Sequence, residues 1–319
     1  MTDAHCHVSA GDPSVRELLI GRDFVGIHPW ESGKVGEWEG GRVGKWEGGR
    51  VGEWEGGRVG EWEGGTVEAW LRARLEADPR RGVGEIGLDR LKAREIPSVM
   101  RAVFEAQLRV AMELGLPVVL HGAKCWGQVV QAIRAFQHLN PQTSNPPTPQ
   151  TSKHPNIQTS QHPNLPNIQT SPTFLFHGFS RSDGLIPDIV ALGGYISVGP
   201  AVLNDHAVNY RVLVKKIPLD RLLVETDRDD APETCLNPLT GAPLSVRDVL
   251  AKTAELRGLA AAELEAITDA NALAFCRVGH PYPGFSDRAM ADRPVVRRCG
   301  AGSCSLRAFS GDSRQDSAR

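Results

Sequence analysis

The feature that most constrains the fold is a pair of histidines at the start of the chain, in the segment Met-Thr-Asp-Ala-His-Cys-His-Val. Asp3, His5 and His7 alternate, so on a β-strand their side chains leave the same face. Two neutral imidazoles at i and i+2 near a strand end can bind one divalent cation from adjacent positions. The pair alone also fits a chance spacing or the remnant of a purification tag, and the rest of the chain must decide.

The length and charge of the chain narrow the classes of protein it can form. A chain of 319 residues accommodates one large α/β barrel or two medium domains. Its net charge of −2 provides no general attraction to polyanions, so any nucleic-acid contact must be local. There is no basic and apolar leader and no run of 18 apolar residues, which predicts a cytoplasmic protein without a membrane partner. The six cysteines lack disulfide-framework spacing and are expected to be reduced thiols.

Residues 32–65 consist of an octapeptide repeated four times, with a tryptophan at the same place in each copy: Trp38, Trp46, Trp54 and Trp62. One interpretation is a flexible arm whose Trp and Arg side chains stack on nucleic-acid bases. The other is a repeat expansion in a surface loop, which chain entropy tolerates at little cost. Each later copy carries one Arg against two Glu, and this slightly acidic balance favours the surface loop.

Two further segments lack the composition of a packed core. Residues 140–173 are rich in Pro, Gln, Thr, Ser and Asn, and residues 279–319 are rich in Arg, Ser and Gly without periodicity. Both compositions predict disorder. We therefore expect a single domain over residues 1–278, which carries the insertions 32–65 and 140–173 and is followed by a disordered tail.

Outside these segments, apolar runs and amphipathic stretches alternate along the chain. Strands are predicted at 23–27, 81–88, 117–120, 174–176, 195–198 and 222–224. Helices are predicted at 66–77, 98–114, 126–139, 188–192, 245–258 and 260–276. This alternation favours a parallel sheet wrapped by helices. Only the stretch 13–20 is ambiguous between a helix and an extended segment.

Six metal-ligand side chains fall at the carboxyl ends of five predicted strands: His5, His7, Glu85, His121, His177 and Asp227. In a (β/α)8 barrel these strand ends converge on one mouth, where functional sites are built. The insertion 32–65 connects a strand to a helix and belongs on that mouth face. The insertion 140–173 connects a helix to a strand, which predicts the opposite face and a segment whose removal leaves activity intact.

The number and type of these side chains suggest a site for two divalent ions. His5, His7 and Asp227 are expected to hold one ion, and His121 and His177 the other, with Glu85 as the bridge. Two such ions can share a water, convert it to hydroxide at neutral pH and offset charge on a phosphoryl or carbonyl oxygen. Asp227 is the candidate to accept the proton of the attacking water. Ligands with O and N atoms but no thiolate admit Mg, Mn or Zn.

Several motifs together resemble the TatD-like metal-dependent hydrolases. They are Asp3-Ala-His-Cys-His7, Gly26-Ile-His-Pro29, Gly84-Glu-Ile-Gly-Leu-Asp89, Phe104-Glu-Ala-Gln-Leu108, Leu116-Pro-Val-Val-Leu-His121, His177-Gly-Phe-Ser180, Tyr195-Ile-Ser-Val-Gly199 and Leu219-Asp-Arg-Leu-Leu-Val-Glu-Thr-Asp227. The resemblance implies a distorted TIM-type barrel, two divalent ions and hydrolysis of phosphodiester bonds in DNA or nucleotides. It assigns metal ligation to the same six residues, with Glu85 and Asp227 as the catalytic carboxylates.

The chain departs from the family pattern at three places. The segment between His7 and Gly26 is short, so one βα unit is expected to be abbreviated. The phrase His121-Gly-Ala-Lys-Cys-Trp126 resembles a compact bacterial subgroup, and it makes Lys124 the candidate for contacting the substrate phosphate. Arg228 follows Asp227 where many relatives have Ser or Ala before Pro. These departures retain all six predicted metal ligands but do not indicate which substrate the chain binds.

Two other side chains near the motifs are expected to serve the structure. His28 also ends a strand, but the following Pro29 predicts a turn instead of a ligand. Asp89 is expected to support a ligand or a turn.

Three functions fit the sequence. The first is a two-metal phosphodiesterase that acts on DNA or nucleotides. The second is an amidohydrolase that acts on C–N or ester bonds, since the same metal-bridging hydroxide attacks a carbonyl carbon, and only substrate profiling separates the two. The third is a non-catalytic binding protein whose working part is the repeat arm; the retention of all six ligands disfavours it.

Overall fold

The computed structural model describes residues 1–35, 38–39, 42–43, 66–91, 94–139, 172–229 and 235–277. The predicted tail over 279–319, nearly all of the insertion 140–173 and most of the repeat 32–65 lie outside these ranges. From the repeat, the structure describes two short strands that pair in antiparallel fashion, β4 (Trp38–Glu39) and β5 (Arg42–Val43).

Parallel strands form the centre of the molecule. They are β1 (Thr2–Cys6), β2 (Arg16–Leu19), β3 (Phe24–Val25), β6 (Gly82–Asp89), β7 (Val118–Ala123), β8 (Phe174–Phe176), β9 (Gly194–Val198) and β10 (Leu222–Val224). β1 pairs with β2, and β3, β6, β7, β8, β9 and β10 pair in this order. A parallel bridge between Ile20 and Phe24 connects the two sheets.

Hydrogen bonds after β10 close the ring of strands. The amide of Asp227 donates to the carbonyl of His5 at 3.0 Å, and the amide of His7 donates to the carbonyl of Arg228 at 2.8 Å. The fold is therefore α/β, with a distorted TIM-type barrel, as the sequence predicts. The shortened unit lies at its start, because residues 7–15 and 20–23 connect β1, β2 and β3 without a helix.

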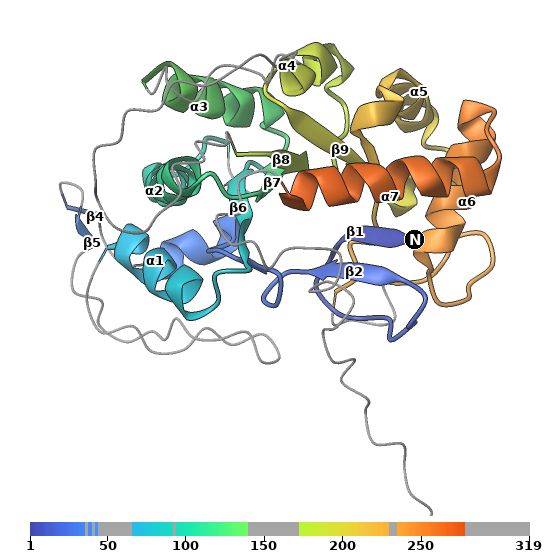
Figure 1. The fold of residues 1–319 in the computed structure, drawn as a ribbon. Helices are drawn as coiled ribbons and strands as arrows, with labels where there is room; N and C mark the ends of the chain where they lie inside the picture. Colours follow the sequence, from blue (N-terminus) through green and yellow to red (C-terminus); the bar gives the residue numbers. More distant parts are fainter. Residues whose placement is uncertain are drawn as a thin grey trace, which may run out of the picture.

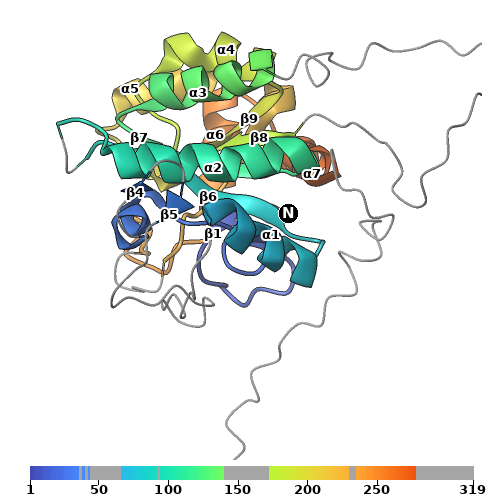
Figure 2. The same cartoon turned by 90° about the vertical axis from the view of Figure 1, so that its left-hand side faces the viewer.

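Helices cover the outside of the barrel. They are α1 (Val67–Ala77), α2 (Ser98–Leu114), α3 (Trp126–Leu139), α4 (Ile186–Ala191), α5 (Val208–Lys216), α6 (Val246–Arg257) and α7 (Ala261–Arg277). Figure 2 shows α1, α2 and α3 side by side on one flank, where α2 contacts both of its neighbours. In Figure 1, α7 runs across the front of the strands and packs against β10 and β1. In the described part of the chain, no helix combines the length and the apolar character needed to cross a bilayer.

The ends of several helices follow from local sequence. Ser245 and Asp248 form the two reciprocal hydrogen bonds of a capping box at the start of α6. α2 ends at Gly115, whose φ of 63° lies in the left-handed region that glycine adopts without a steric penalty. α5 was not predicted, because its sequence is rich in β-branched residues and its N-cap, Ala207, provides no side-chain hydrogen bond.

The barrel interior has its own apolar core, separate from the core beneath the outer helices. It takes one side chain from each of seven strands: Ala4, Leu18, Phe24, Val119, Leu175, Tyr195 and Leu223. Ala272, Phe275 and Cys276 of α7 complete this cluster. One end of the barrel is thus filled by apolar side chains and by α7, and polar groups must lie beyond this layer.

Candidate metal centre

Polar side chains form the next layer of the barrel toward the carboxyl ends of the strands. His121, His177 and Glu225 follow the interior residues Val119, Leu175 and Leu223 by two positions, so they point to the same side of their strands. All three are largely shielded from solvent, since their side chains are 13%, 7% and 0% exposed. The layer above the apolar core is therefore a buried polar cluster.

The carboxylate of Glu85 lies at the centre of this cluster. Its Oε1 atom is 2.6 Å from Nε2 of His177 and 2.7 Å from Nδ1 of His121. Its Oε2 atom faces the other pair, at 3.3 Å from Nε2 of His7 and 3.5 Å from Nε2 of His5. Each oxygen of one carboxylate thus serves a different pair of histidines.

The position of Glu85 within its strand differs from the sequence-based expectation. Glu85 was expected at the carboxyl end of the strand predicted over 81–88, but it lies inside β6, which continues to Asp89. His5 and His121 also lie inside β1 and β7, whereas His7, His177 and Asp227 follow their strands. The predicted strand ends were wrong because a fully buried strand lacks the alternation of polar and apolar residues that would mark its last residue.

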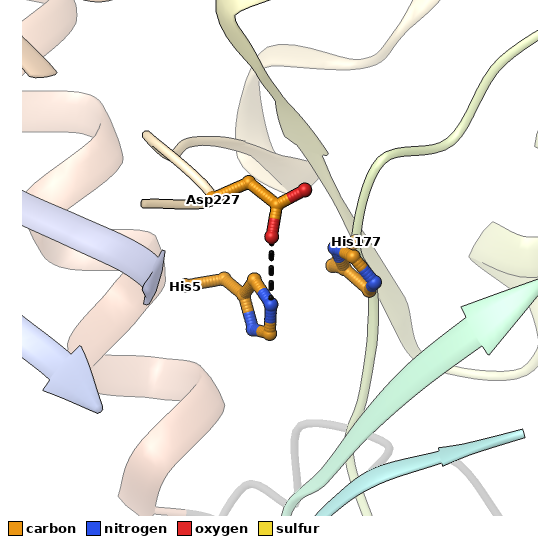
Figure 3. Close-up of side chains that lie close together, drawn as sticks. All are labelled: His5, His177 and Asp227. Carbon is orange, nitrogen blue, oxygen red and sulfur yellow. Dashed lines mark ion pairs between the residues drawn. The ribbon is translucent and has the colours of Figure 1, made fainter. Parts of the chain in front are cut away.

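Asp227 approaches the cluster from the segment after β10. Its Oδ1 atom is 3.3 Å from Nε2 of His5, and the close-up in Figure 3 shows this carboxylate above the His5 ring, with His177 to one side. The rings of His5 and His177 stack with their centroids 4.1 Å apart. The Asp227 side chain is 45% exposed, so one carboxylate of the cluster reaches solvent. The structure thus brings all six predicted ligands together.

The charges in the cluster shift its pKa values strongly. Burial opposes protonation of His177, but the charge of Glu85 outweighs burial and raises the pKa of His177 to about 10. Burial would raise the pKa of Glu85, yet the charge of His177 and the hydrogen bonds from His121 and His177 hold it well below its usual range. Burial lowers the pKa of His5 to about 4. The cluster therefore favours a positive charge close to Glu85.

Unsatisfied ring nitrogens indicate that the cluster suits a divalent cation. Both ring nitrogens of His5 are buried without a hydrogen-bond partner, although the ring is surrounded by possible ligands. Ligand atoms lie within 4.8 Å of one another in two sets that contain this ring: His5, His7 and Glu85, and His5, His177 and Asp227. Imidazole nitrogens and carboxylate oxygens are ligands of Zn, Mn and related divalent metals. The residues present therefore fit a metal centre.

His28 lies in the cluster, although its sequence context predicted only a turn. Its Nε2 atom is 3.5 Å from Oε1 of Glu85, and together with Glu85 and His121 it forms a third set of possible ligands. However, its Nδ1 atom accepts a hydrogen bond from the amide of Trp30 at 3.1 Å. The neutral ring then carries its proton on Nε2, which makes that atom a donor toward Glu85 and a poor ligand.

Asp89 supports His121 from the side away from Glu85. Its Oδ2 atom is 3.0 Å from Nε2 of His121 and accepts the indole N–H of Trp30 at 2.8 Å. Burial opposes ionisation of Asp89, but the hydrogen bond with His121 and that from the amide of Leu91 lower its pKa to about 2. A carboxylate that holds one nitrogen of an imidazole fixes the ring for ligation through the other nitrogen. This arrangement agrees with the supporting role expected for Asp89.

Two further buried carboxylates, Glu225 and Asp3, were given no ligand role by the sequence reasoning. Glu225 is fully buried, accepts hydrogen bonds from Ser197 and from the amide of Gly178, and has its pKa raised to about 7 by burial. Asp3 accepts the amide and hydroxyl hydrogens of Thr226 at 2.9 and 2.6 Å. Asp3 therefore connects β1 to the end of β10, and it belongs to none of the three sets of possible ligands among the described residues. The alternation of Asp3 with His5 and His7 was the only signal in the sequence that drew attention to Asp3.

Lys124, the predicted phosphate contact, lies in the turn after β7. Its side chain is exposed, and its φ of 58° lies in the left-handed region. The turn places the residue at the carboxyl end of the barrel, three positions after His121.

Fold and site together define a class. A parallel α/β barrel with a cluster of histidines and carboxylates at the carboxyl ends of its strands has the architecture of a metal-dependent barrel enzyme.

Comparison with known proteins identifies the family. The family model described as TatD related DNase matches residues 22–277. The chain belongs to this family. It is 28% identical to the "3'-5' ssDNA/RNA exonuclease TatD" of Klebsiella pneumoniae strain 342 over 197 residues. The matched region covers 59% of this chain and 62% of that protein.

The chain is also similar to a second curated protein and to a solved structure. The chain is 25% identical over 199 residues to the "Uncharacterized metal-dependent hydrolase YabD" of Bacillus subtilis strain 168, with 61% of this chain and 65% of that protein covered. The crystal structure of the TatD homologue YJJV from Escherichia coli K12 matches with a TM-score of 0.47 and 27% identity, over 65% of this chain and 69% of that chain. The chain thus spans less than two thirds of the length of these curated relatives.

Proposed function

We propose that this chain is a cytoplasmic, divalent-metal-dependent phosphodiesterase that hydrolyses DNA or nucleotides. The observation that carries the proposal is the position of Glu85, whose two carboxylate oxygens face two separate pairs of histidines. Such a carboxylate suits a bridge between two cations that are held a few ångströms apart. The nuclease names of relatives in the same family support phosphodiesters as the substrate.

Six residues would hold the ions. His5, His7 and Asp227 would provide one ion with ligands, His121 and His177 the other, and Glu85 would contribute one oxygen to each. When bound, two divalent ions supply Lewis acids that acidify water and offset the negative charge of a phosphoryl group.

The chain itself contributes proton transfer and orientation. The carboxylate of Asp227 is partly exposed and close to His5, which suits it to accept the proton of an attacking water. Lys124 would attract the substrate phosphate from the turn after β7. His28 would donate the hydrogen on Nε2 to an oxygen in the site, since its other nitrogen is already an acceptor.

Metal content and phosphodiester hydrolysis, measured on the same preparation, test the proposal. The purified full chain is stripped with a chelator, titrated separately with Mg, Mn and Zn, and assayed with a single-stranded DNA oligonucleotide and bis-p-nitrophenyl phosphate. The proposal expects two ions per chain and turnover that depends on them. Stoichiometric metal binding with hydrolysis of amides or carboxylic esters, but not of phosphodiesters, would replace it with a carbonyl hydrolase. Failure to bind any of the metals would overturn it.

A further inference from the structure

His177 presents its two ring nitrogens to two different carboxylates. Nε2 is 2.6 Å from Oε1 of Glu85, at the centre of the cluster. Nδ1 faces a second carboxylate: it is buried without a hydrogen-bond partner, and Oε1 of Glu225 lies 3.9 Å from it. His177 therefore lies between the central carboxylate and an outer one that is fully buried.

Glu225 is held in place by groups on two neighbouring segments. Its Oε2 atom accepts the hydroxyl hydrogen of Ser197 in β9, and its Oε1 atom accepts the amide hydrogen of Gly178 at 2.8 Å. Gly178 directly follows His177, so the carboxylate is bonded to the segment that carries the ring. On another side the fit is close, because a β-carbon at Gly199 would lie 3.3 Å from Oε1. These contacts fix the carboxylate beside Nδ1.

The burial of Glu225 requires a positive partner. A carboxylate that is removed from water is costly unless its charge is compensated. The two hydrogen-bond donors, Ser197 and Gly178, are neutral. Among the described residues, the one ion-pair contact of Glu225 is with His177. A hydrogen on Nδ1 and a cation at Nε2 would both direct positive charge toward this carboxylate.

The ring of His121 is placed in the same way. Its Nδ1 atom is 2.7 Å from Oε1 of Glu85, and its Nε2 atom is 3.0 Å from Oδ2 of Asp89. Both histidines assigned to the second ion thus lie between Glu85 and an outer carboxylate. The ring of His5, by contrast, has two buried nitrogens without a hydrogen-bond partner. The outer carboxylates therefore distinguish the site of His121 and His177 from the site of His5.

We propose that Glu225 is the positioning residue of His177: its charge keeps the ring hydrogen on Nδ1 and leaves Nε2 as the nitrogen that ligates a metal ion. The inference rests on the proposed metal-dependent function and adds to it a residue outside the ligand set. At 3.9 Å the contact is longer than a hydrogen bond, so Glu225 acts through its charge. Loss of a group that orients a ligating imidazole typically lowers metal affinity by about 10- to 100-fold.

The test uses the full chain, stripped with a chelator, and three substitutions. Glu225→Gln removes the charge but retains the size, and its amide can still accept from Gly178 and donate to Ser197. Ser197→Ala removes one hydrogen bond to Glu225 and leaves the charge. Glu263→Gln changes an exposed residue of α7 and is the matched control. Competition calorimetry with a chelator measures the affinity of each zinc ion.

In Glu225→Gln we expect one of two zinc ions to bind about 10- to 100-fold more weakly and the other to be unaffected. Ser197→Ala and Glu263→Gln should retain both affinities. A merely structural role would lower the thermal stability of Glu225→Gln and Ser197→Ala alike, without a selective loss of one ion. The inference is overturned if Glu225→Gln keeps both affinities, if it weakens both ions equally, or if Ser197→Ala loses as much.

Nitrogen NMR examines the ring without any change to Glu225. Histidines are labelled with nitrogen-15, and long-range correlations in the zinc-loaded wild-type protein identify which ring nitrogen of His177 carries the hydrogen. The resonances that are absent from His177→Asn provide the assignment. We expect the hydrogen on Nδ1 and zinc on Nε2. The opposite arrangement, or failure of the wild-type protein to bind zinc, would overturn the inference even if Glu225→Gln does not fold.

Hydrolysis of bis-p-nitrophenyl phosphate by the same wild-type preparation separates the two proposals. Metal-dependent turnover, with zinc affinities that are equal in the wild type and Glu225→Gln, would refute the positioning role alone. A selective loss of one ion in Glu225→Gln, without any metal-dependent phosphodiester hydrolysis by the wild type, would refute the phosphodiesterase alone.

Discussion

Oε1 of Glu85 lies 2.6 Å from Nε2 of His177, and this buried contact joins β6 to the segment after β8. The same oxygen contacts His121, while Oε2 faces His5 and His7. One side chain therefore connects every histidine assigned to the two ions. The variants that test the centre follow from this relationship.

We expect Glu85→Gln to reduce metal-dependent hydrolysis at least about 100-fold, because it removes the charge that both ions share. Metal content, measured by mass spectrometry after dialysis, should fall below two ions per chain. Glu76→Gln is the matched control, since Glu76 is an exposed residue of α1. Full metal content together with wild-type rates in Glu85→Gln would contradict the bridging role.

His28 should be dispensable for metal binding, although it approaches Glu85. His28→Asn retains an acceptor that can cap the short 3-10 helix η1 (Pro29–Lys34), because Asn is a favoured N-cap residue. We expect its metal affinity to fall by no more than about 10- to 100-fold, as for residues that act from outside the ligand set. His7→Asn should instead lose measurable binding of one ion. Calorimetric titration compares the two variants, and equal losses would identify His28 as a ligand.

Asp89→Asn tests the support of His121. The substitution retains size and removes the charge that holds Nε2 of His121 at 3.0 Å. We expect metal affinity to fall by about 10- to 100-fold, while the two-ion stoichiometry at saturating metal is retained. Asp78→Asn, which changes an aspartate that pairs with Arg80 after α1, is the control. An unchanged affinity in Asp89→Asn would show that packing alone orients His121.

Asp3 should matter for stability. It is 1% exposed and satisfies both the amide and the hydroxyl of Thr226. Asp3→Ala leaves these groups buried without a partner, which costs about 1–3 kcal/mol in the free energy of unfolding. Urea denaturation measures the difference. In Thr226→Val the side-chain bond is also lost, so adding Asp3→Ala to this variant should cost less than in the wild type. Additive losses would argue against the bond.

Local sequence patterns encode part of the site, and contacts between distant segments complete it. Alternating strands and helices, together with polar residues near strand ends, were sufficient to predict the barrel and to bring His5, His121 and His177 together. The donor role of His28 was not visible, because it depends on a backbone contact from Trp30. The bond between Trp30 and Asp89 joins residues 59 positions apart, and no pattern within one element encodes such a contact.

The Pro- and Gln-rich insertion is expected to be dispensable for activity. Its described neighbours are α3, which ends at Leu139, and β8, which begins at Phe174. A segment that enters the amino end of a strand lies on the face of the barrel away from the metal centre. We therefore expect replacement of residues 142–171 by a short Gly/Ser linker to leave kcat/KM for an oligonucleotide within about twofold of the wild-type value, since long surface loops are thermodynamically inexpensive.

The repeat provides the matched comparison for this deletion. Removal of residues 40–63 shortens the connection between η1 and α1, and η1 carries Trp30 at the mouth. We expect this deletion to change KM for long oligonucleotides more than KM for bis-p-nitrophenyl phosphate. A large loss of activity on replacing 142–171, in a protein that still folds and binds metal, would place that insertion on the face of the site.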